Sequence, residues 1–187
     1  MAGALATVIN RRSFEANVRA IMKIWGSYSV TGLAAAAAAL LIDQLHKIWM
    51  VSIFEHGQTA KITVAPFFDL VLVWNRGISY GMFRQDSDAG RWLLIGFAAA
   101  AALALTLWLA QLQTRLSAAS VGLIIGGALG NAADRVHYGA VADFFSFHVA
   151  GFNWYVFNLA DVAIVAGVAG LLLDSARSRH KNAQNAT

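Results

Sequence analysis

The chain has 187 residues, of which 58% are hydrophobic and only 13% are charged, so its composition lies well outside that of an ordinary soluble domain. Fourteen lysines and arginines against ten aspartates and glutamates give a net charge of +4. Because the sequence has no cysteine, disulfides, thiolate metal sites and a cysteine nucleophile are excluded. A basic excess in so apolar a chain is typical of residues that flank membrane spans, and we expect no nucleic-acid partner.

Four long stretches are almost free of charged residues, and each is about long enough to cross the roughly 30 Å of a bilayer's hydrocarbon core. They comprise residues 24–42, 92–114, 116–133 and about 154–173, and only Asp161 interrupts the last. The first stretch lacks a persuasive signal-peptide cleavage site, which favours a retained helix. We therefore predict an all-α membrane protein, a bundle of four transmembrane helices.

Lysines and arginines gather on one side of this bundle. They lie before the first span, between the second and third, and after the fourth: Arg11, Arg12, Arg19, Lys23, Arg115, Arg177, Arg179 and Lys181. Cytoplasmic flanks are enriched in such residues, so both termini are expected in the cytoplasm. This predicts a cytoplasmic basic amphipathic segment at 1–27, a membrane domain at 28–175 and a cytoplasmic basic tail at 176–187.

The external segments have patterns of their own. Residues 61–74, within an insertion of about 50–90 between the first two spans, are rich in β-branched and aromatic residues. This composition predicts a small extracytoplasmic sheet, in which Pro66 favours an edge or a turn. The second external segment, about 137–153, includes an apolar run at 144–147 that we expect to dip into the membrane interface.

Ionisable and amide side chains interrupt the predicted spans near their outer ends. An ionisable residue at membrane depth costs about 2.5–3.5 kcal/mol on insertion scales, so each is a candidate functional residue. The candidates are Asp43, Asn131, Asp134, Arg135, Asn158 and Asp161. The three in the third span share one helical stripe, and Asn158 and Asp161 are spaced i, i+3.

Asp143 and Asp161 form a candidate catalytic pair. A chain that turns back around residues 151–153 would bring them together, whereas one unbroken helix would hold them about 27 Å apart. Two adjacent carboxylates in a low dielectric share a proton, so that one acts on a water as base and the other as acid. Alternatively, either aspartate pairs with Arg135 to hold the bundle, and composition alone leaves both interpretations open.

Several weaker sequence patterns favour a structural role over a catalytic or metal-binding one. Ser79 lies in a G-x-S-x-G pattern, but the chain is too short and too apolar for the hydrolase fold that uses it. The histidines show no metal-binding spacing, and we expect no metal and no cofactor. Gly122, Gly126 and Gly130 predict close helix packing, and Asn75 is either a turn residue or a functional one.

Five short motifs occur in a fixed order over about residues 28–175. They are Asp43-Gln44-Leu45-His46-Lys47, Asn75-Arg76-Gly77, Gly130-Asn131-Ala132-Ala133-Asp134-Arg135, Val141-Ala142-Asp143-Phe144 and Phe157-Asn158-Leu159-Ala160-Asp161. Together they resemble the motifs of the bacterial lipoprotein signal peptidases (signal peptidase II), which are aspartic peptidases of the inner membrane. Ile78, Ser79 and Tyr80 depart from the side chains that are frequent in that family.

The resemblance implies that Asp143 and Asp161 are catalytic and that Asp134 is structural. It implies supporting or substrate-binding roles for Asp43, Lys47, Asn75, Gly77, Asn131, Arg135 and Asn158. The implied substrate is a prolipoprotein with a lipid-modified cysteine just after the scissile bond, and membrane lipids surround an enzyme expected to act as a monomer.

The sequence is also compatible with two other classes of function. A small proton-coupled transporter subunit would use Asp43, Asp134 and Asp161 as a relay across the membrane. An assembly or scaffold protein would use the glycine-lined helix faces for packing.

Overall fold

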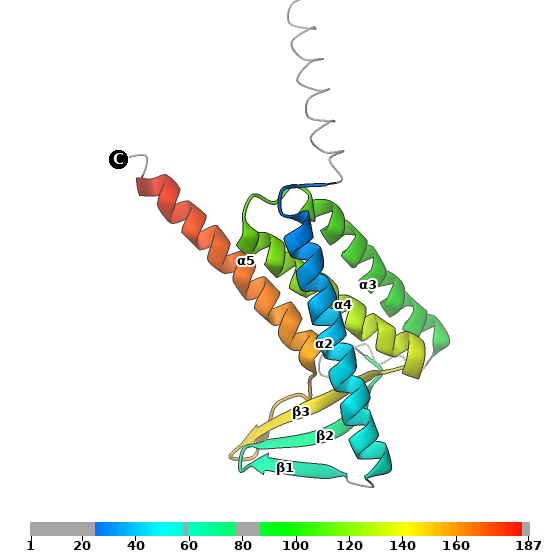
Figure 1. Cartoon of the computed structure of the whole chain (residues 1–187). Helices are drawn as coiled ribbons and strands as arrows, with labels where there is room; N and C mark the ends of the chain where they lie inside the picture. Colours follow the sequence, from blue (N-terminus) through cyan, green and yellow to red (C-terminus); the bar gives the residue numbers. More distant parts are fainter. Residues whose placement is uncertain (1–24, 58–59, 78–86, 185–187) are drawn as a thin grey trace, which may run out of the picture.

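The structure is a computed structural model that describes residues 25–57, 60–77 and 87–184. Within these ranges it has four helices, α2 (Ser29–His56), α3 (Asp88–Leu109), α4 (Arg115–Tyr138) and α5 (Leu159–Gln184). It also has four strands there, β1 (Lys61–Ala65), β2 (Phe68–Asn75), β3 (Val141–Val149) and β4 (Phe152–Asn153). The helices pack together and the sheet lies at one end of them (Figure 1).

All four of these helices are long and apolar enough to cross a membrane. Many of their large apolar side chains point away from the protein; Leu93 and Phe97 of α3, for example, are 69% and 74% exposed. Such a surface fits contact with lipid tails, which are as apolar as leucine itself. The prediction of four membrane-capable helices is confirmed.

Two predicted helix boundaries are wrong. The first helix continues past Asp43 to His56, because Lys47 lies one turn further on and pairs with the buried Asp43 carboxylate. The last helix begins at Leu159 instead of near Trp154, and Asn158 caps it. Asp161 therefore lies in the first turn of α5, not two turns inside a longer helix.

Helix α4 packs against each of the other three described helices, and α2 also contacts α5. Glycines permit this close approach. A Cβ at Gly126 would meet the backbone carbonyl of Ala36 in α2, and a Cβ at Gly127 would meet that of Ala160 in α5. The buried apolar cluster within the bundle consists of Ala36, Ala102, Leu109, Ala118, Val121 and Ile125. The close packing predicted from the glycines is confirmed.

The strands pair antiparallel in the order β1-β2-β3-β4. Strands β1 and β2 come from the predicted insertion, and Pro66 lies in the turn between them, as expected. The sequence pattern did not predict β3, whose apolar residues were expected to dip into the interface. Of these residues, Phe144 packs with Ala142 on the outer part of α2, in a buried cluster with Met50, Val51 and Phe54, whereas Phe147 is 38% exposed.

Two predictions fall on positions outside the described residues. They are the amphipathic helix expected within 1–27, of which only residues 25–27 are described, and the G-x-S-x-G serine at position 79.

Candidate active site

A buried cluster of charges joins α2 to α4. Lys47 Nζ lies 2.9 Å from Asp43 Oδ2 and 2.8 Å from Asp134 Oδ2, and all three side chains are at most 1% exposed. Gly130 makes room for the cluster, because a Cβ there would lie 2.5 Å from Asp43 Oδ2. Charges at this depth are costly unless they are paired and hydrogen-bonded, so loss of any one of the three would leave an uncompensated buried charge.

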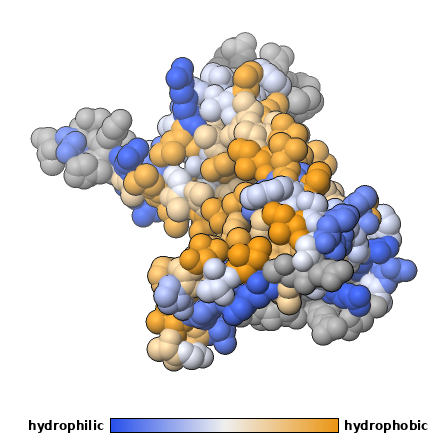
Figure 2. Space-filling view, turned by 60° about the horizontal axis from the view of Figure 1, so that its bottom comes forward, coloured by the Kyte–Doolittle hydropathy of each residue, from blue (hydrophilic) through white to orange (hydrophobic). Residues whose placement is uncertain are grey.

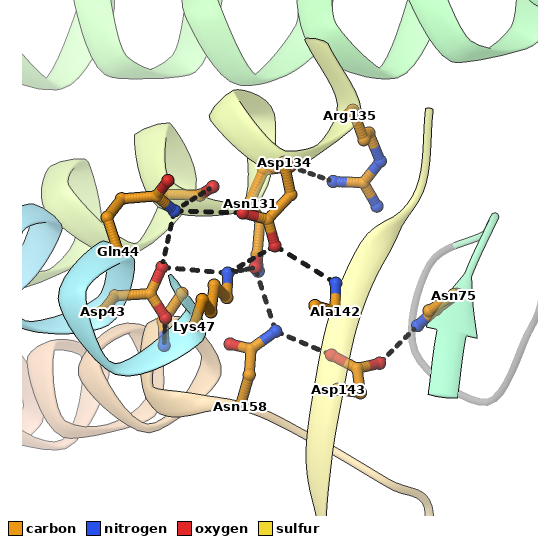
Figure 3. Close-up of polar contacts among 12 residues, drawn as sticks. Asp43, Gln44, Lys47, Asn75, Asn131, Asp134, Arg135, Ala142, Asp143 and Asn158 are labelled. Carbon is orange, nitrogen blue, oxygen red and sulfur yellow. Dashed lines mark hydrogen bonds and ion pairs between the residues drawn. The ribbon is translucent and has the colours of Figure 1, made fainter. Parts of the chain in front are cut away.

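Hydrogen bonds satisfy the remaining oxygens of this cluster (Figure 3). Gln44 Nε2 donates to Asp134 Oδ1 at 3.0 Å and to Asp43 Oδ2 at 3.2 Å. The backbone amide of Ala160 donates to Asp43 Oδ1, and that of Ala142 donates to Asp134 Oδ2. The cluster thereby fixes the start of α5 and the start of β3, the elements that carry the two candidate catalytic aspartates. Gln44 was not among the residues predicted for the site, although it lies in the first motif, next to Asp43.

Asn131 connects the charge cluster to the candidate catalytic pair. Its Oδ1 accepts hydrogen bonds from Lys47 Nζ and from Asn158 Nδ2, each at 3.1 Å. Since both neighbours are donors, the Asn131 amide presents its own Nδ2 to the other side, where it donates to Asp161 Oδ1 at 2.9 Å. Asn131 thus orients one oxygen of Asp161.

Asn158 and Asp161 cap the first turn of α5 reciprocally. The backbone amide of Asp161 donates to Asn158 Oδ1 at 3.0 Å, and the backbone amide of Asn158 donates to Asp161 Oδ2 at 3.3 Å. This is the geometry of a capping box, which explains the i, i+3 spacing of the two residues. The remaining group of the buried Asn158 amide, Nδ2, donates to Asp143 Oδ1 at 2.6 Å. One side chain therefore contacts both aspartates.

Asn75, at the end of β2, binds the other oxygen of Asp143. Its Nδ2 donates to Asp143 Oδ2 at 3.0 Å, while its Oδ1 accepts from the backbone amide of Gly77 at 2.9 Å. The second bond closes a local turn of the kind that asparagine favours. The two interpretations of Asn75 are compatible, because this residue both closes a turn and contacts Asp143.

The pKa of Asp143 is raised to about 7, first by burial and then by the nearby Asp161 carboxylate. Hydrogen bonds from Asn75 and Asn158 act in the opposite direction, because they stabilise the ionised carboxylate. Asp143 is only 2% exposed, which accounts for the dominance of burial. Near neutral pH a proton is therefore readily held on Asp143, as acid–base chemistry on a water requires.

Arg135 contacts backbone oxygens. Its Nη1 donates to the carbonyl of Asn131 at 3.2 Å, and its Nη2 donates to the carbonyl of Gly77 at 2.7 Å. Across the described part of the chain, no ion pair joins Arg135 to Asp143 or Asp161. The alternative in which Arg135 pairs with either aspartate is therefore not supported; Arg135 instead ties α4 to the turn after β2.

The aspartates open onto a cavity of about 280 Å³ between the sheet and the helices. Its polar wall consists of Asn75, Gly77, Asn131, Arg135, Asp143 and Asp161. Its apolar wall comes from α3, α4, β3, α5 and the chain before α5: Leu94, Phe97, Ala98, Ala128, Val141, Tyr155, Val156, Ile164 and Val165. All nine predicted site residues lie in this wall or in the hydrogen-bonded network behind it. In the described ranges, no group of three or more metal-ligating side chains is placed to hold a metal ion.

Comparison with known proteins gives consistent matches. The sequence model of the family described as Signal peptidase (SPase) II matches residues 35–177. The lipoprotein signal peptidase of Nitrobacter hamburgensis is 56% identical over 149 residues, which cover 78% of this chain and 91% of the relative. That of a Methylobacterium species is 53% identical over 146 residues, which cover 78% and 88% of the two chains.

Two solved structures, both described as bacterial membrane enzymes, share the fold. One has a TM-score of 0.66 and 22% identity, and the match covers 80% of this chain and 89% of the other. The second has a TM-score of 0.62 and 23% identity, with coverages of 77% and 91%. Since the family match spans most of the sequence and the relatives are more than half identical, the chain belongs to the signal peptidase II family of membrane aspartic endopeptidases.

Proposed function

We propose that this protein removes the signal peptide from lipid-modified lipoprotein precursors by cutting the peptide bond just before the lipid-modified cysteine. Family membership gives the class of enzyme. The observation that carries the assignment of residues is the placement of Asp143 and Asp161 on either side of the buried Asn158, both of them in the wall of one cavity.

In the proposed mechanism, a water molecule lies between the two carboxyl groups. The ionised Asp161 accepts a proton from this water as the water oxygen bonds to the scissile carbonyl carbon. The protonated Asp143 donates a hydrogen bond to the carbonyl oxygen, which becomes an oxyanion. The C–N bond then breaks, and the leaving amine receives a proton from the dyad. The raised pKa of Asp143 suits it to the role of acid.

The apolar wall of the cavity suggests how the substrate reaches this dyad. Phe97 of α3 and Val165 of α5 bound the cavity on two sides, and both helices pack on α4. A signal peptide in the lipid could therefore lie as a helix along α3 and α5 and extend its end into the cavity. This entry route requires no passage through water, which suits a substrate that is anchored by acyl chains.

We also propose the bacterial inner membrane as the location, with both termini in the cytoplasm and the site near the periplasmic face. Helix α2 begins and α5 ends on the side away from the sheet (Figure 1), and Arg115, Arg177 and Arg179 lie at helix ends on that same side. In this proposal the chain divides into a cytoplasmic segment (1–27), a membrane domain (28–175) and a cytoplasmic tail (176–187). The enzyme acts as a monomer surrounded by membrane lipid. A proton relay is not favoured, because Lys47 holds Asp43 and Asp134 in ion pairs.

The decisive experiment incubates the purified protein in detergent with a diacylglyceryl-modified precursor, with and without a metal chelator. Asp143→Asn and Asp161→Asn should each give no product while the protein still inserts into membranes, and chelator should have no effect. Asp174→Asn is the matched control, because Asp174 lies on the same helix as Asp161 but bonds to Thr114 and Ser117 at the other end. Turnover by either dyad variant would remove the assignment.

A further inference from the structure

The two turns of the sheet lie side by side at one end. Phe68, just after the first turn, pairs with Phe147, and the backbone amide of His148 donates to the carbonyl of Phe67 at 2.9 Å. The second turn consists of Ala150 and Gly151, which have φ values of 50° and 84°. A two-residue turn with two positive φ values closes a hairpin tightly, so the flanking Val149 and Phe152 form its tip.

This end of the sheet exposes large apolar side chains, although it belongs to an external segment. The group that we name the apolar end consists of Val64 (57% exposed), Phe67 (52%), Phe147 (38%), Val149 (65%), Phe152 (62%) and Trp154 (46%). Figure 2 shows hydrophobic surface that continues from the helices to the lower left of the molecule, where the sheet ends. Contiguous exposed patches of this kind usually mark a binding surface.

The opposite face of the same strands is polar. Asp69 Oδ2 lies 2.9 Å from His148 Nε2 and 3.2 Å from Lys61 Nζ, across β1, β2 and β3. The pKa of Asp69 is held below its ordinary value mainly by a hydrogen bond from Thr63, and hydrogen bonds from Lys61 and His148 act in the same direction. The sheet is therefore amphipathic, with a charged face that suits water and an apolar end that does not.

A line of aromatic contacts joins the apolar end to the lipid-facing surface of α2. Trp49, which is 60% exposed, contacts the ring of His46, and His46 contacts Phe145 at a centroid distance of 5.3 Å. Phe145 contacts Phe68, which stacks on Phe147 at 4.6 Å. Exposed tryptophans at the ends of spans lie at the level of lipid headgroups. The apolar end consequently continues the membrane-facing band of the bundle at its outer edge.

We propose that the apolar end of the sheet inserts into the outer leaflet of the bilayer, with lipid as its occupant, and holds β3 at a fixed depth. Asp143 and Phe147 lie four residues apart on this strand, or about 13 Å. Anchoring the tip in lipid would therefore fix the height of Asp143 relative to a lipid-anchored peptide bond. This consequence rests on the proposed function, whereas the insertion itself can be tested without any activity.

The natural absence of cysteine allows a direct depth measurement. Single cysteines at Phe67 or Phe152 would carry a nitroxide label, in protein reconstituted into vesicles of phosphatidylethanolamine and phosphatidylglycerol. We expect both labels to be relaxed by oxygen, which partitions into lipid, and shielded from a water-soluble nickel chelate. Lys61→Cys, on the 55%-exposed side chain of the polar face, should show the reverse. Insertion would be contradicted if the labels at positions 67 and 152 were relaxed by oxygen and by the nickel chelate to the same extents as the label at position 61. It would also be contradicted if both reagents failed to relax them, as in a protein contact.

A second measurement tests the fixed depth. The double variant Phe67→Ser and Phe152→Ser should cleave a precursor in vesicles several-fold more slowly than the parent protein, but at the parent rate in detergent micelles. Equal loss in both media would assign these residues a structural role and contradict the proposal, as would unchanged cleavage in vesicles. If the spin labels show insertion but the cleavage comparison gives either of these results, the tip inserts into lipid without fixing the depth of Asp143. The Asp143→Asn and Asp161→Asn variants test the proposed function separately.

Discussion

Asn158 and Asp143, fifteen residues apart in the chain, are joined by a hydrogen bond of 2.6 Å from Asn158 Nδ2 to Asp143 Oδ1. The same asparagine caps the helix that carries Asp161. The distance between the two aspartates therefore depends on a helix cap, so local folding at the start of α5 and the geometry of the proposed dyad cannot change independently.

Replacement of Asn158 by alanine should damage both properties. Loss of the cap costs about 1 kcal/mol. Leaving the buried Asp143 carboxyl without this hydrogen-bond partner costs about 1–3 kcal/mol. Where that second cost applies to the transition state, kcat drops by roughly five- to a hundredfold. Single-turnover cleavage of a lipid-modified precursor measures this drop, and thermal unfolding in detergent measures the cap.

Asn153→Ala provides the matched control for this substitution. Asn153 is an exposed asparagine on β4 that lies outside the cavity wall, and we expect wild-type rates from this variant. An Asn158→Ala protein with unchanged kcat would contradict the role of this amide in positioning Asp143.

The pKa of about 7 for Asp143 predicts the alkaline limb of the pH profile. The proposed mechanism needs the protonated form of this residue, which is abundant below pH 7 and is lost as the pH rises through that value. The value of kcat/KM should therefore fall above about pH 7. Because the two carboxyls interact, the fitted value belongs to the pair. A rate that stays flat well into alkaline pH would exclude Asp143 as the acid.

Asn75→Ala should move this limb in a defined direction. The hydrogen bond from Asn75 lowers the pKa of Asp143, because it stabilises the ionised carboxylate. Its removal should raise that pKa and shift the alkaline limb to higher pH, although the maximal rate falls. A merely structural role for Asn75 would lower the rate at every pH without moving the limb, and the pH profile distinguishes the two outcomes.

Part of this arrangement could be predicted from the sequence because it is encoded locally. The i, i+3 spacing of Asn158 and Asp161 reflects one turn of helix. A turn-back around residues 151–153 is the condition for bringing Asp143 beside Asp161, because one unbroken helix would hold them about 27 Å apart.

The sequence did not predict where Asp143 would be held. Strand β3 forms because Phe144 packs on α2 while its neighbour Asp143 faces the cavity, and this alternation depends on partners distant in sequence. The length of α2 was underestimated for a similar reason. From the sequence, Asp43 marks the end of the first span, because the sequence shows neither its ion pair with Lys47 nor the second carboxylate, Asp134 of α4, that pairs with the same lysine.

Lys47→Met should be strongly destabilising. It leaves Asp43 and Asp134 buried without their cation, a change that typically costs about 3–5 kcal/mol. Thermal unfolding in detergent should show a large drop in Tm, and adding Asp43→Asn and Asp134→Asn should recover part of it. Lys61→Met, which removes an exposed lysine from a surface ion pair, should change Tm little. Equal Tm values for Lys47→Met and the wild type would show that the cluster does not stabilise the fold.

Gly126→Ala tests the close contact between α4 and α2. A Cβ at this position would meet the backbone carbonyl oxygen of Ala36, which cannot rotate away as a side chain could. The helices must separate, at a cost of about 1–3 kcal/mol that is typical of overpacking, and the charge cluster between the same two helices should loosen with them.

Gly96→Ala is the matched control, because a Cβ there has no neighbour within 4 Å and alanine is the better helix former. We therefore expect a lower Tm and slower cleavage from Gly126→Ala, and an unchanged or higher Tm from Gly96→Ala. Similar Tm values for the two variants would mean that helix propensity, and not the α2–α4 contact, determines the need for glycine at position 126.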